Sequence, residues 1–187
     1  MKKIIFWVFI VLFVLFVAAI LWRVFEMDAK SIFSDITPSE AAKRAYGSGE
    51  KILTHDVDQP MSFDGYMQVY SFVYIPEERE LQIMVKHNQS VYEKLGASSE
   101  AGFAFKLYNT ETEEEYTDYT ASRDMEGRYR YYRLLFSGVE FSDEADIELV
   151  MYPSGNDESH SALKLHKSGE EFYDYKMSKK EIESLGG

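Results

Sequence analysis

A run of 19 uncharged residues near the N-terminus constrains this chain more than any other feature. The run extends from Ile4 to Trp22, and all but four of its residues are isoleucine, leucine, phenylalanine or valine. As an α-helix it would be about 28 Å long, which is close to the thickness of a hydrocarbon core. Lys2 and Lys3 precede the run and Arg23 closes it. This pattern predicts a transmembrane helix over residues 4–22.

The charges around this segment predict its orientation. Lysines before an apolar span favour a cytoplasmic N-terminus, so residues 1–3 are expected in the cytoplasm and a C-terminal domain outside. The alternative is a cleaved signal peptide, with small residues at Val17-Ala18-Ala19, but no polar segment separates these from the apolar run. We therefore expect a retained signal anchor in the cell membrane, a juxtamembrane segment over residues 23–36, and an extracytoplasmic domain over residues 37–187.

Apolar and polar residues alternate along much of this outer domain. Residues 81–85, 103–107 and 147–151 are the clearest examples, and a period of two is typical of strands with one buried face. About eight or nine such strands at short spacing, without long helices between them, favour antiparallel sheets packed face to face. The predicted fold class is therefore mainly β: an N-terminal transmembrane helix followed by an antiparallel β-sandwich with three short helices.

One segment suggests a more specific architecture. The stretch FSDEADIELVMY, residues 141–152, leads from an acidic turn into a strand, which is similar to immunoglobulin-like sandwiches. The chain has no cysteine, and both of its tryptophans belong to the apolar run, so the disulfide and core tryptophan of those domains are missing. The similarity therefore concerns architecture and implies no function.

The three short helices are predicted from capping signals. Thr37 with Pro38 and Glu40 forms a capping-box pattern, and Gly47 would end that helix. The same kind of signal starts at Ser90, with Gly96 as the end, and at Ser178, with Gly186 as the end.

Two hairpins follow from turn residues between strand patterns. A strand over residues 66–75 meets Pro76-Glu77-Glu78-Arg79 and returns as the strand at Leu81. The strands 163–166 and 172–175 flank a Lys-Ser-Gly-Glu turn. Tyr66, Tyr70 and Tyr74 are expected on one face of the first strand, where a sheet core is the favoured interpretation and a carbohydrate platform the alternative.

The stretch RYRYYRLLF, residues 128–136, is the main candidate for a binding surface. Its site residues are Arg128, Tyr129, Arg130, Tyr131, Tyr132 and Arg133. The acidic stretch ETEEEYTDY, residues 111–119, precedes it and predicts a hairpin between the two. One register places Glu113 opposite Arg133, Tyr116 opposite Arg130, and Asp118 opposite Arg128, so that the arginines have local acidic partners. The alternative is a tyrosine-arginine face that stacks on a sugar or a peptide.

The charge of the chain limits its partners. The net charge is -12, and residues 31–187 alone carry 16 basic and 30 acidic residues. A surface this negative repels nucleic-acid phosphates, so no nucleic-acid partner is expected. The absence of cysteine removes thiolate zinc sites and cysteine nucleophiles. Predicted partners are the membrane and a protein of the cell envelope, and the sequence leaves the oligomeric state open.

No motif in the sequence points to catalysis or to a cofactor. The four histidines, His55, His87, His160 and His166, lack metal-site spacing and are interpreted as ordinary surface residues. Acidic loops at residues 56–65 and 154–158 are weak calcium candidates, without the spacing of a calcium-binding loop. Catalytic elbows and phosphate loops are missing. We therefore predict no catalytic residues, no metal site and no cofactor.

These features predict a non-enzymatic binding or scaffolding module of the cell envelope, held by a single membrane anchor. A wall- or carbohydrate-binding module that uses the tyrosine-arginine strand is the second hypothesis. An envelope hydrolase is the third, because 30 acidic residues make some close pair of carboxylates inevitable.

Overall fold

The computed structural model describes most of the chain, in two compact units. The described residues are 2–33, 36–55, 61–63, 65, 67–88, 102–126, 129–140, 142–155 and 160–186. One unit comprises residues 1–35 and the other Ile36–Gly187. The first holds a single helix, and the second holds all of the described strands and two further helices.

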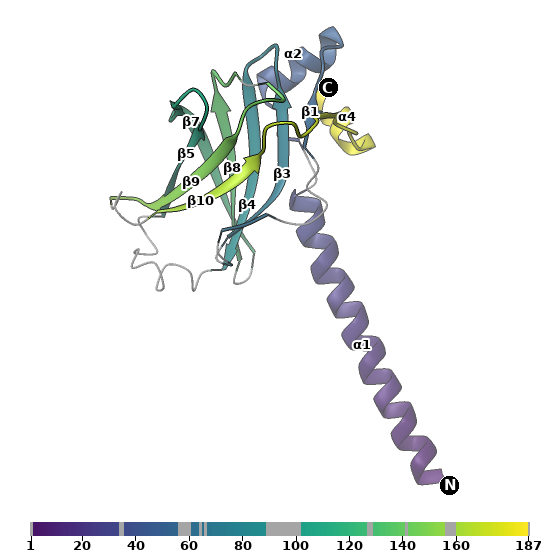
Figure 1. Cartoon of the computed structure of the whole chain (residues 1–187). Helices are drawn as coiled ribbons and strands as arrows, with labels where there is room; N and C mark the ends of the chain where they lie inside the picture. Colours follow the sequence, from purple (N-terminus) through teal and green to yellow (C-terminus); the bar gives the residue numbers. More distant parts are fainter. Residues whose placement is uncertain are drawn as a thin grey trace. The chain divides into compact units, whose positions relative to one another are not determined.

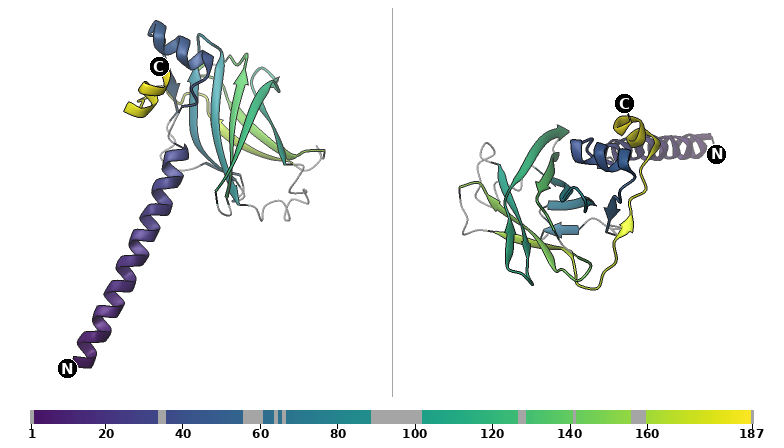
Figure 2. Two further views of the ribbon diagram at one scale, coloured as in Figure 1. Left: turned by 180° about the vertical axis from the view of Figure 1, so that it is seen from behind. Right: turned by 90° about the horizontal axis from the view of Figure 1, so that it is seen from above.

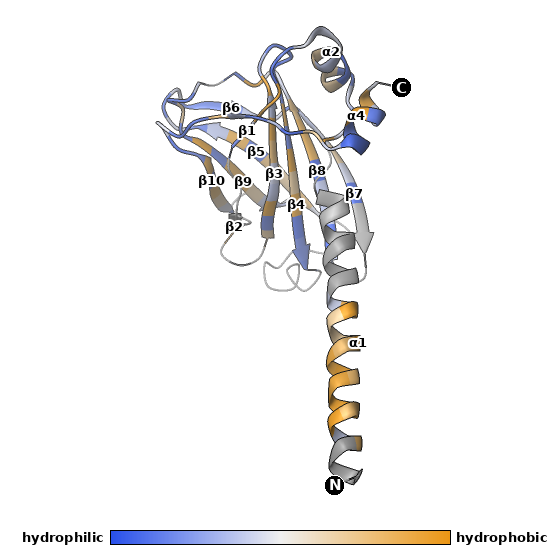
Figure 3. Ribbon diagram, turned by 90° about the vertical axis from the view of Figure 1, so that its right-hand side faces the viewer, coloured by the Kyte–Doolittle hydropathy of each residue, from blue (hydrophilic) through white to orange (hydrophobic). Residues whose placement is uncertain are grey.

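Helix α1, Lys2–Phe33, makes up the first unit. It begins with the apolar run and continues through most of the predicted juxtamembrane segment. The side chains from Phe6 to Trp22 are described, and Figure 3 shows most of this part of the helix as hydrophobic. Within the described part of the chain, no helix is both long enough and apolar enough to cross a membrane.

The second unit is mainly β and contains two antiparallel sheets (Figure 1). The larger, seven-stranded sheet has the order β11-β1-β3-β4-β8-β7, and β2 also pairs with β3. Its strands are β1 (Leu53–Thr54), β2 (Met61–Phe63), β3 (Met67–Ile75), β4 (Glu80–Asn88), β7 (Tyr119–Glu126), β8 (Tyr129–Ser137) and β11 (Tyr173–Asp174).

The smaller, four-stranded sheet has the order β10-β9-β5-β6. Its strands are β5 (Phe103–Asn109), β6 (Glu114–Tyr116), β9 (Ile147–Pro153) and β10 (Ser161–His166). Figure 2 shows the two sheets from behind and from above. The described strands are more numerous than the sequence predicts, because β1 and β2 are too short to give a periodic signal.

One apolar core lies between the two sheets. The alternating residues of the three clearest predicted strands all face it: Leu81, Ile83, Val85, Phe103, Phe105, Leu107, Ile147, Leu149 and Met151 are buried. We call the side of the seven-stranded sheet that carries Leu81 and Ile83 its inner face, and the opposite side its outer face. The mainly β prediction with antiparallel sheets is confirmed.

A second, smaller apolar cluster covers one end of the outer face. It is formed by Ile36, Ala42, Ala45, Ile52, Val73, Ile75 and Leu185. These residues come from α2 (Glu40–Ser48), from α4 (Lys179–Leu185), from β3 and from the segments beside them. Thus the two short helices cover part of a sheet and are not themselves the core.

Helix α2 forms where predicted, but its caps are different. Ser39, not Thr37, is the N-cap: its hydroxyl accepts a hydrogen bond from the Ala42 amide, and Gly49 in the left-handed region ends the helix. The Thr37 backbone is bonded to β4 instead: its amide donates to the Gln82 side chain at 2.8 Å, and the Gln82 amide group donates back to the Thr37 carbonyl. A contact with β4 therefore overrides the local capping pattern.

Helix α4 has the predicted caps. Ser178 and Glu181 form a complete capping box, and Gly186 is the C-cap. The helix predicted from Ser90 to Gly96 lies outside the described residues.

The hairpin of β3 and β4 is confirmed, with Ile75 opposite Glu80. The prediction that Tyr70 and Tyr74 share one face is wrong, because a bulge between Val69 and Ser71 shifts the register at Tyr70. Tyr74 is buried in the core, whereas the Tyr70 ring lies beside Lys86. Tyr66 lies outside the described residues.

The predicted hairpin across the Lys-Ser-Gly-Glu turn is wrong. Strand β10 pairs with β9 in the smaller sheet, while β11 pairs with β1 in the larger one. The turn is held from outside, since the Gly169 amide donates to the Asp143 carbonyl at 2.9 Å and Gly169 has a φ of 86°. The chain therefore crosses from one sheet to the other here.

The hairpin predicted between the acidic and basic stretches is also wrong. Glu114 to Tyr116 form β6 and pair with β5, whereas the segment from Tyr119 to Glu126, predicted to contain a turn, is the strand that pairs with β8. Tyr116 is buried, and its hydroxyl lies 2.9 Å from the Glu140 carbonyl. Burial of this ring keeps the acidic stretch in the smaller sheet, and the chain changes sheets after it.

Candidate functional site

The predicted binding strand is β8, and its residues are divided between two environments. Tyr132 is part of the core. The centre of its ring lies 5.4 Å from that of Phe105 and 5.3 Å from that of His87, on which it stacks. Arg130 is in register with His87, on the same inner side. Tyr129, Tyr131 and Arg133 alternate with these two residues and lie on the outer face. Arg128 lies outside the described residues.

The cross-strand neighbours of the arginines are not the predicted acidic residues. Arg133 has Met84 on one side and Ser122 on the other, and Arg130 has His87 and Met125. The acidic stretch has a different basic partner, because Glu115 forms an ion pair with Lys106 of the neighbouring strand β5. The partners predicted for Arg130 and Arg133 are therefore wrong, although the strand itself exists where predicted.

A group of half-buried side chains surrounds Lys86 on the outer face. The Lys86 ammonium lies 4.2 Å from the ring centre of Tyr129 and 5.7 Å from that of Tyr70. The Tyr70 hydroxyl donates to the Gln68 side chain at 2.7 Å. We call Tyr70, Lys86, Tyr129 and Arg133 the outer-face patch. It combines two cations with two aromatic rings in an otherwise acidic domain.

A second group of polar residues comes from three separate segments. His55 follows β1, His166 ends β10, and Glu170 belongs to the turn after it. The Nε2 atom of His55 lies 3.2 Å from Oε2 of Glu170, and the two imidazole ring centres are 5.3 Å apart. One potential ligand atom from each residue lies within 4.8 Å of the others. We call these three residues the histidine cluster.

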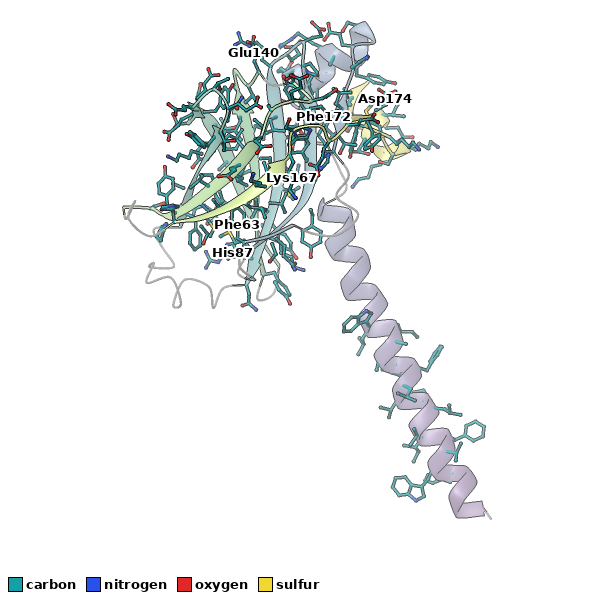
Figure 4. The ribbon with its side chains drawn as sticks, in the orientation of Figure 1. Phe63, His87, Glu140, Lys167, Phe172 and Asp174 are labelled. Carbon is teal, nitrogen blue, oxygen red and sulfur yellow. The ribbon has the colours of Figure 1, made fainter. Side chains whose placement is uncertain are left out.

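Aromatic side chains form the wall behind this cluster. The Phe172 ring stacks on His166 with 4.5 Å between the ring centres, and it also stacks on Phe72. Figure 4 shows Phe172 close to Lys167 of the turn, far from His87 at the other end of the sheets. His166 is fully buried, whereas the His55 side chain is 13% exposed and that of Glu170 is 39% exposed. The cluster is thus closed on one side and accessible on the other.

Hydrogen bonds fix the turn that carries Glu170. Asp146 accepts from the Ser168 amide at 2.7 Å and from the Lys164 ammonium at 2.9 Å. The bond from the Ser168 amide and the bond from Lys164 hold the pKa of Asp146 below its usual value. The Glu170 carboxylate itself accepts from the Lys167 amide at 2.8 Å. The position of Glu170 is therefore determined by the fold.

The interpretation of the histidines as surface residues is wrong for His87 and His166, which are buried, and correct for the exposed His160. The long separation of His55 from His166 along the chain gave no signal that they meet. The calcium candidates lie largely outside the described residues.

These features define a two-sheet, mainly β protein with an apolar helix, an outer-face patch and a histidine cluster. No protein family model, no curated protein and no solved structure matches the chain. The immunoglobulin-like arrangement stays a prediction.

Proposed function

We propose that this protein is a non-enzymatic binding module of the cell envelope, held at the cell membrane by its N-terminal helix. The observation that carries the proposal is the exposure of α1. Its described apolar side chains are uncovered, with Phe9 70% exposed and Trp22 73% exposed. A helix that is apolar all round requires an apolar environment, either a protein core or a lipid bilayer.

The energetics favour the bilayer for this helix. Fifteen isoleucine, leucine, phenylalanine and valine residues at about -0.4 kcal/mol each favour insertion by roughly 6 kcal/mol. Trp7 and Trp22 lie near the two ends, where indole rings prefer the membrane interface. The finding that no helix could cross a membrane concerns the described residues alone, and the described side chains of α1 run from Phe6 to Trp22. The proposal also counts Ile4 and Ile5, which it takes from the sequence.

The proposed orientation follows from Lys2 and Lys3. Positive charges close to the start of a span remain in the cytoplasm, so the two-sheet domain would lie on the extracytoplasmic side. The excess of acidic residues in that domain does not oppose this orientation. The positive-inside rule depends on lysine and arginine near the span, and acidic residues contribute little.

The outer-face patch is the proposed contact surface for a protein partner. Tyrosine and arginine are enriched at the centres of protein interfaces, and the patch places two tyrosine rings beside Lys86, with Arg133 on the same face of the sheet. Its positive charge would favour an acidic partner segment, whereas the rest of the domain would repel one. Tyr132 and Arg130, on the inner side of the same strand, are excluded from this surface by their position.

Membrane fractionation tests the anchor. We expect the full chain to stay with membranes through carbonate washing and to be released by detergent, while a variant lacking residues 4–22 is released without it. Protease added to intact spheroplasts should digest the two-sheet domain if the orientation is right. Recovery of the full chain in the soluble fraction would contradict the proposal.

Site-specific photo-crosslinking tests the contact surface. A photoreactive phenylalanine in place of Tyr129 should crosslink to a discrete protein in living cells. The matched control is the same substitution at Tyr173, which is exposed and lies on the edge strand β11. Equal crosslinking from both positions, or none from either, would contradict a specific surface.

The two aromatic rings of the patch favour one second candidate, a carbohydrate- or wall-binding module. Sugars stack on aromatic faces, and the Lys86 ammonium would have to leave the Tyr129 ring to allow this. Cosedimentation with purified cell wall separates the candidates: loss of sedimentation in Tyr129→Ala, with retention in Tyr173→Ala, would favour the carbohydrate.

A further inference from the structure

We propose that His55, His166 and Glu170 bind a divalent metal ion, and that zinc is the metal that these residues fit. The proposal is independent of the function proposed above. It rests on the convergence of three metal-binding side chains from three separate segments at a half-open position between the two sheets.

The distances suit a tetrahedral site. The Nε2 atom of His55 and the Oε2 atom of Glu170 are 3.2 Å apart. Two ligands with bonds of about 2 Å to one tetrahedral zinc ion are separated by roughly 3.3 Å. A ligand atom of His166 lies within 4.8 Å of the other two, so a small movement of side chains brings all three to one ion.

Both ring nitrogens of His166 lie near backbone carbonyl oxygens. Its Nδ1 atom lies 2.7 Å from the Ala145 carbonyl oxygen, and its Nε2 atom lies 2.9 Å from the Glu170 carbonyl oxygen. A zinc ion bonded to Nε2 at about 2 Å would lie close to where the Glu170 carbonyl oxygen is, so binding requires this carbonyl to move aside.

The contact of the His166 Nδ1 atom suits a metal ligand. With Nδ1–H donating to Ala145, His166 has the backbone contact that typically orients a metal-bound histidine. Its Nε2 atom then lies on the side of Glu170, whose carboxylate is next to His55. The Nδ1 atom of His55 is buried and has no hydrogen-bond partner among the described residues, whereas its Nε2 atom faces the Glu170 carboxylate.

The residue types select the metal. Two imidazoles and one carboxylate suit zinc, whereas calcium and magnesium prefer oxygen ligands alone. The partial exposure of His55 and Glu170 gives an ion a route from solvent and leaves a coordination position for water. The acidic domain would raise the local concentration of cations.

Titration of the purified full chain in detergent, after treatment with a chelator, tests the site. We expect one zinc ion per chain in calorimetry, a higher Tm with zinc than without, and visible absorption bands of tetrahedral Co²⁺ when cobalt is added instead. Calcium and magnesium at the same concentration should leave the Tm unchanged.

Two variants and one control connect the binding to the cluster. His55→Ala and Glu170→Gln change partly exposed side chains, and each should weaken zinc binding by about 100-fold or more. His160→Ala removes an exposed histidine outside the cluster and should bind zinc like the unmodified chain. Circular dichroism confirms that each variant is folded before titration.

Three results would overturn the proposal. The first is the absence of saturable zinc binding in the folded chain. The second is unchanged affinity in folded His55→Ala and Glu170→Gln. The third is an equal loss of affinity in His160→Ala, which would indicate binding by histidines in general.

Discussion

At the scale of single residues, the buried polar side chains carry the clearest consequences. His87 is 1% exposed and packs its ring against Tyr132 and Phe103. Burial, opposed by a hydrogen bond to the Asn88 carbonyl and helped by the charge of Arg130, lowers the pKa of His87 to about 4. The folded protein therefore holds this ring neutral under conditions in which an unfolded chain would charge it.

We predict that His87 makes the protein sensitive to acid. The unfolded chain binds a proton near pH 6.5 and the folded chain near pH 4, so the unfolded state holds more protons between these values. The free energy of unfolding should fall as pH drops through this window, by on the order of 3 kcal/mol from His87. Urea unfolding of His87→Phe across the window should show a smaller fall, whereas His160→Phe should match the unmodified chain.

Glu181 is the second residue of this kind. It is buried, and its carboxylate accepts hydrogen bonds from the Ile36 amide, the Tyr175 hydroxyl and the Ser178 amide. Ile36 is 145 residues away in the chain. One side chain therefore joins the beginning of the two-sheet domain to its last helix.

We expect Glu181→Ala to lower the free energy of unfolding by about 3 kcal/mol, because three donors lose their acceptor. Glu183→Ala is the matched control in the same helix: its carboxylate is exposed and lies 3.8 Å from Lys179, so a change below about 0.5 kcal/mol is expected. Similar effects of both substitutions in chemical denaturation would show that Glu181 acts only through helix propensity.

At the scale of elements, the sequence predicts strands well and their neighbours poorly. The alternation at Phe103, Phe105 and Leu107 reports burial of one face, and the structure confirms it. The same alternation contains no information on which sheet a strand joins. The chain changes sheets between β6 and β7 and again between β10 and β11, and both predicted hairpins at these places are wrong.

The histidine cluster and the contacts of Lys86 with Tyr129 and Tyr70 were missed for the same reason. His55 and His166 meet only because β1 and β10 lie in different sheets around one core. Lys86 reaches Tyr129 because β4 pairs with β8, and Tyr70 reaches Lys86 only through a bulge. Capping of α4, by contrast, is local in the chain and was predicted correctly.

The placement of β6 can be tested with one tyrosine. Burial raises the pKa of Tyr116 to about 12, with a further rise from its hydrogen bond to Glu114. We predict that Tyr116→Ala costs about 3 to 5 kcal/mol, as expected for a buried aromatic residue. Tyr108→Ala, on the half-buried side of the adjacent strand β5, should cost about 1 kcal/mol. A small effect at Tyr116, measured by urea unfolding, would favour an exposed hairpin instead.

At the scale of the whole molecule, the chain consists of one helix and one self-contained domain. The domain from Ile36 to Gly187 has its own core between two sheets and its own second cluster under α2 and α4. Among the described side chains, neither cluster includes a residue of α1. The stability of the domain should therefore not depend on the helix.

We predict that a fragment of residues 36–187 folds alone. Its circular dichroism should be mainly β, and it should unfold in a single transition with the same midpoint as the domain within the full chain in detergent. A mainly helical spectrum, or loss of cooperative unfolding, would contradict the division into two units. Expression without the apolar run also gives soluble material for the pH and denaturation measurements.

The contact between Glu181 and Ile36 has a mechanical consequence. Any force that reaches the two-sheet domain along the polypeptide from α1 arrives first at Ile36. The Ile36 amide donates a hydrogen bond to Glu181 of the C-terminal helix. Helix α4 thus stabilises the place where the two-sheet domain is joined to α1. Removal of a few C-terminal residues should weaken this contact before it disturbs either sheet.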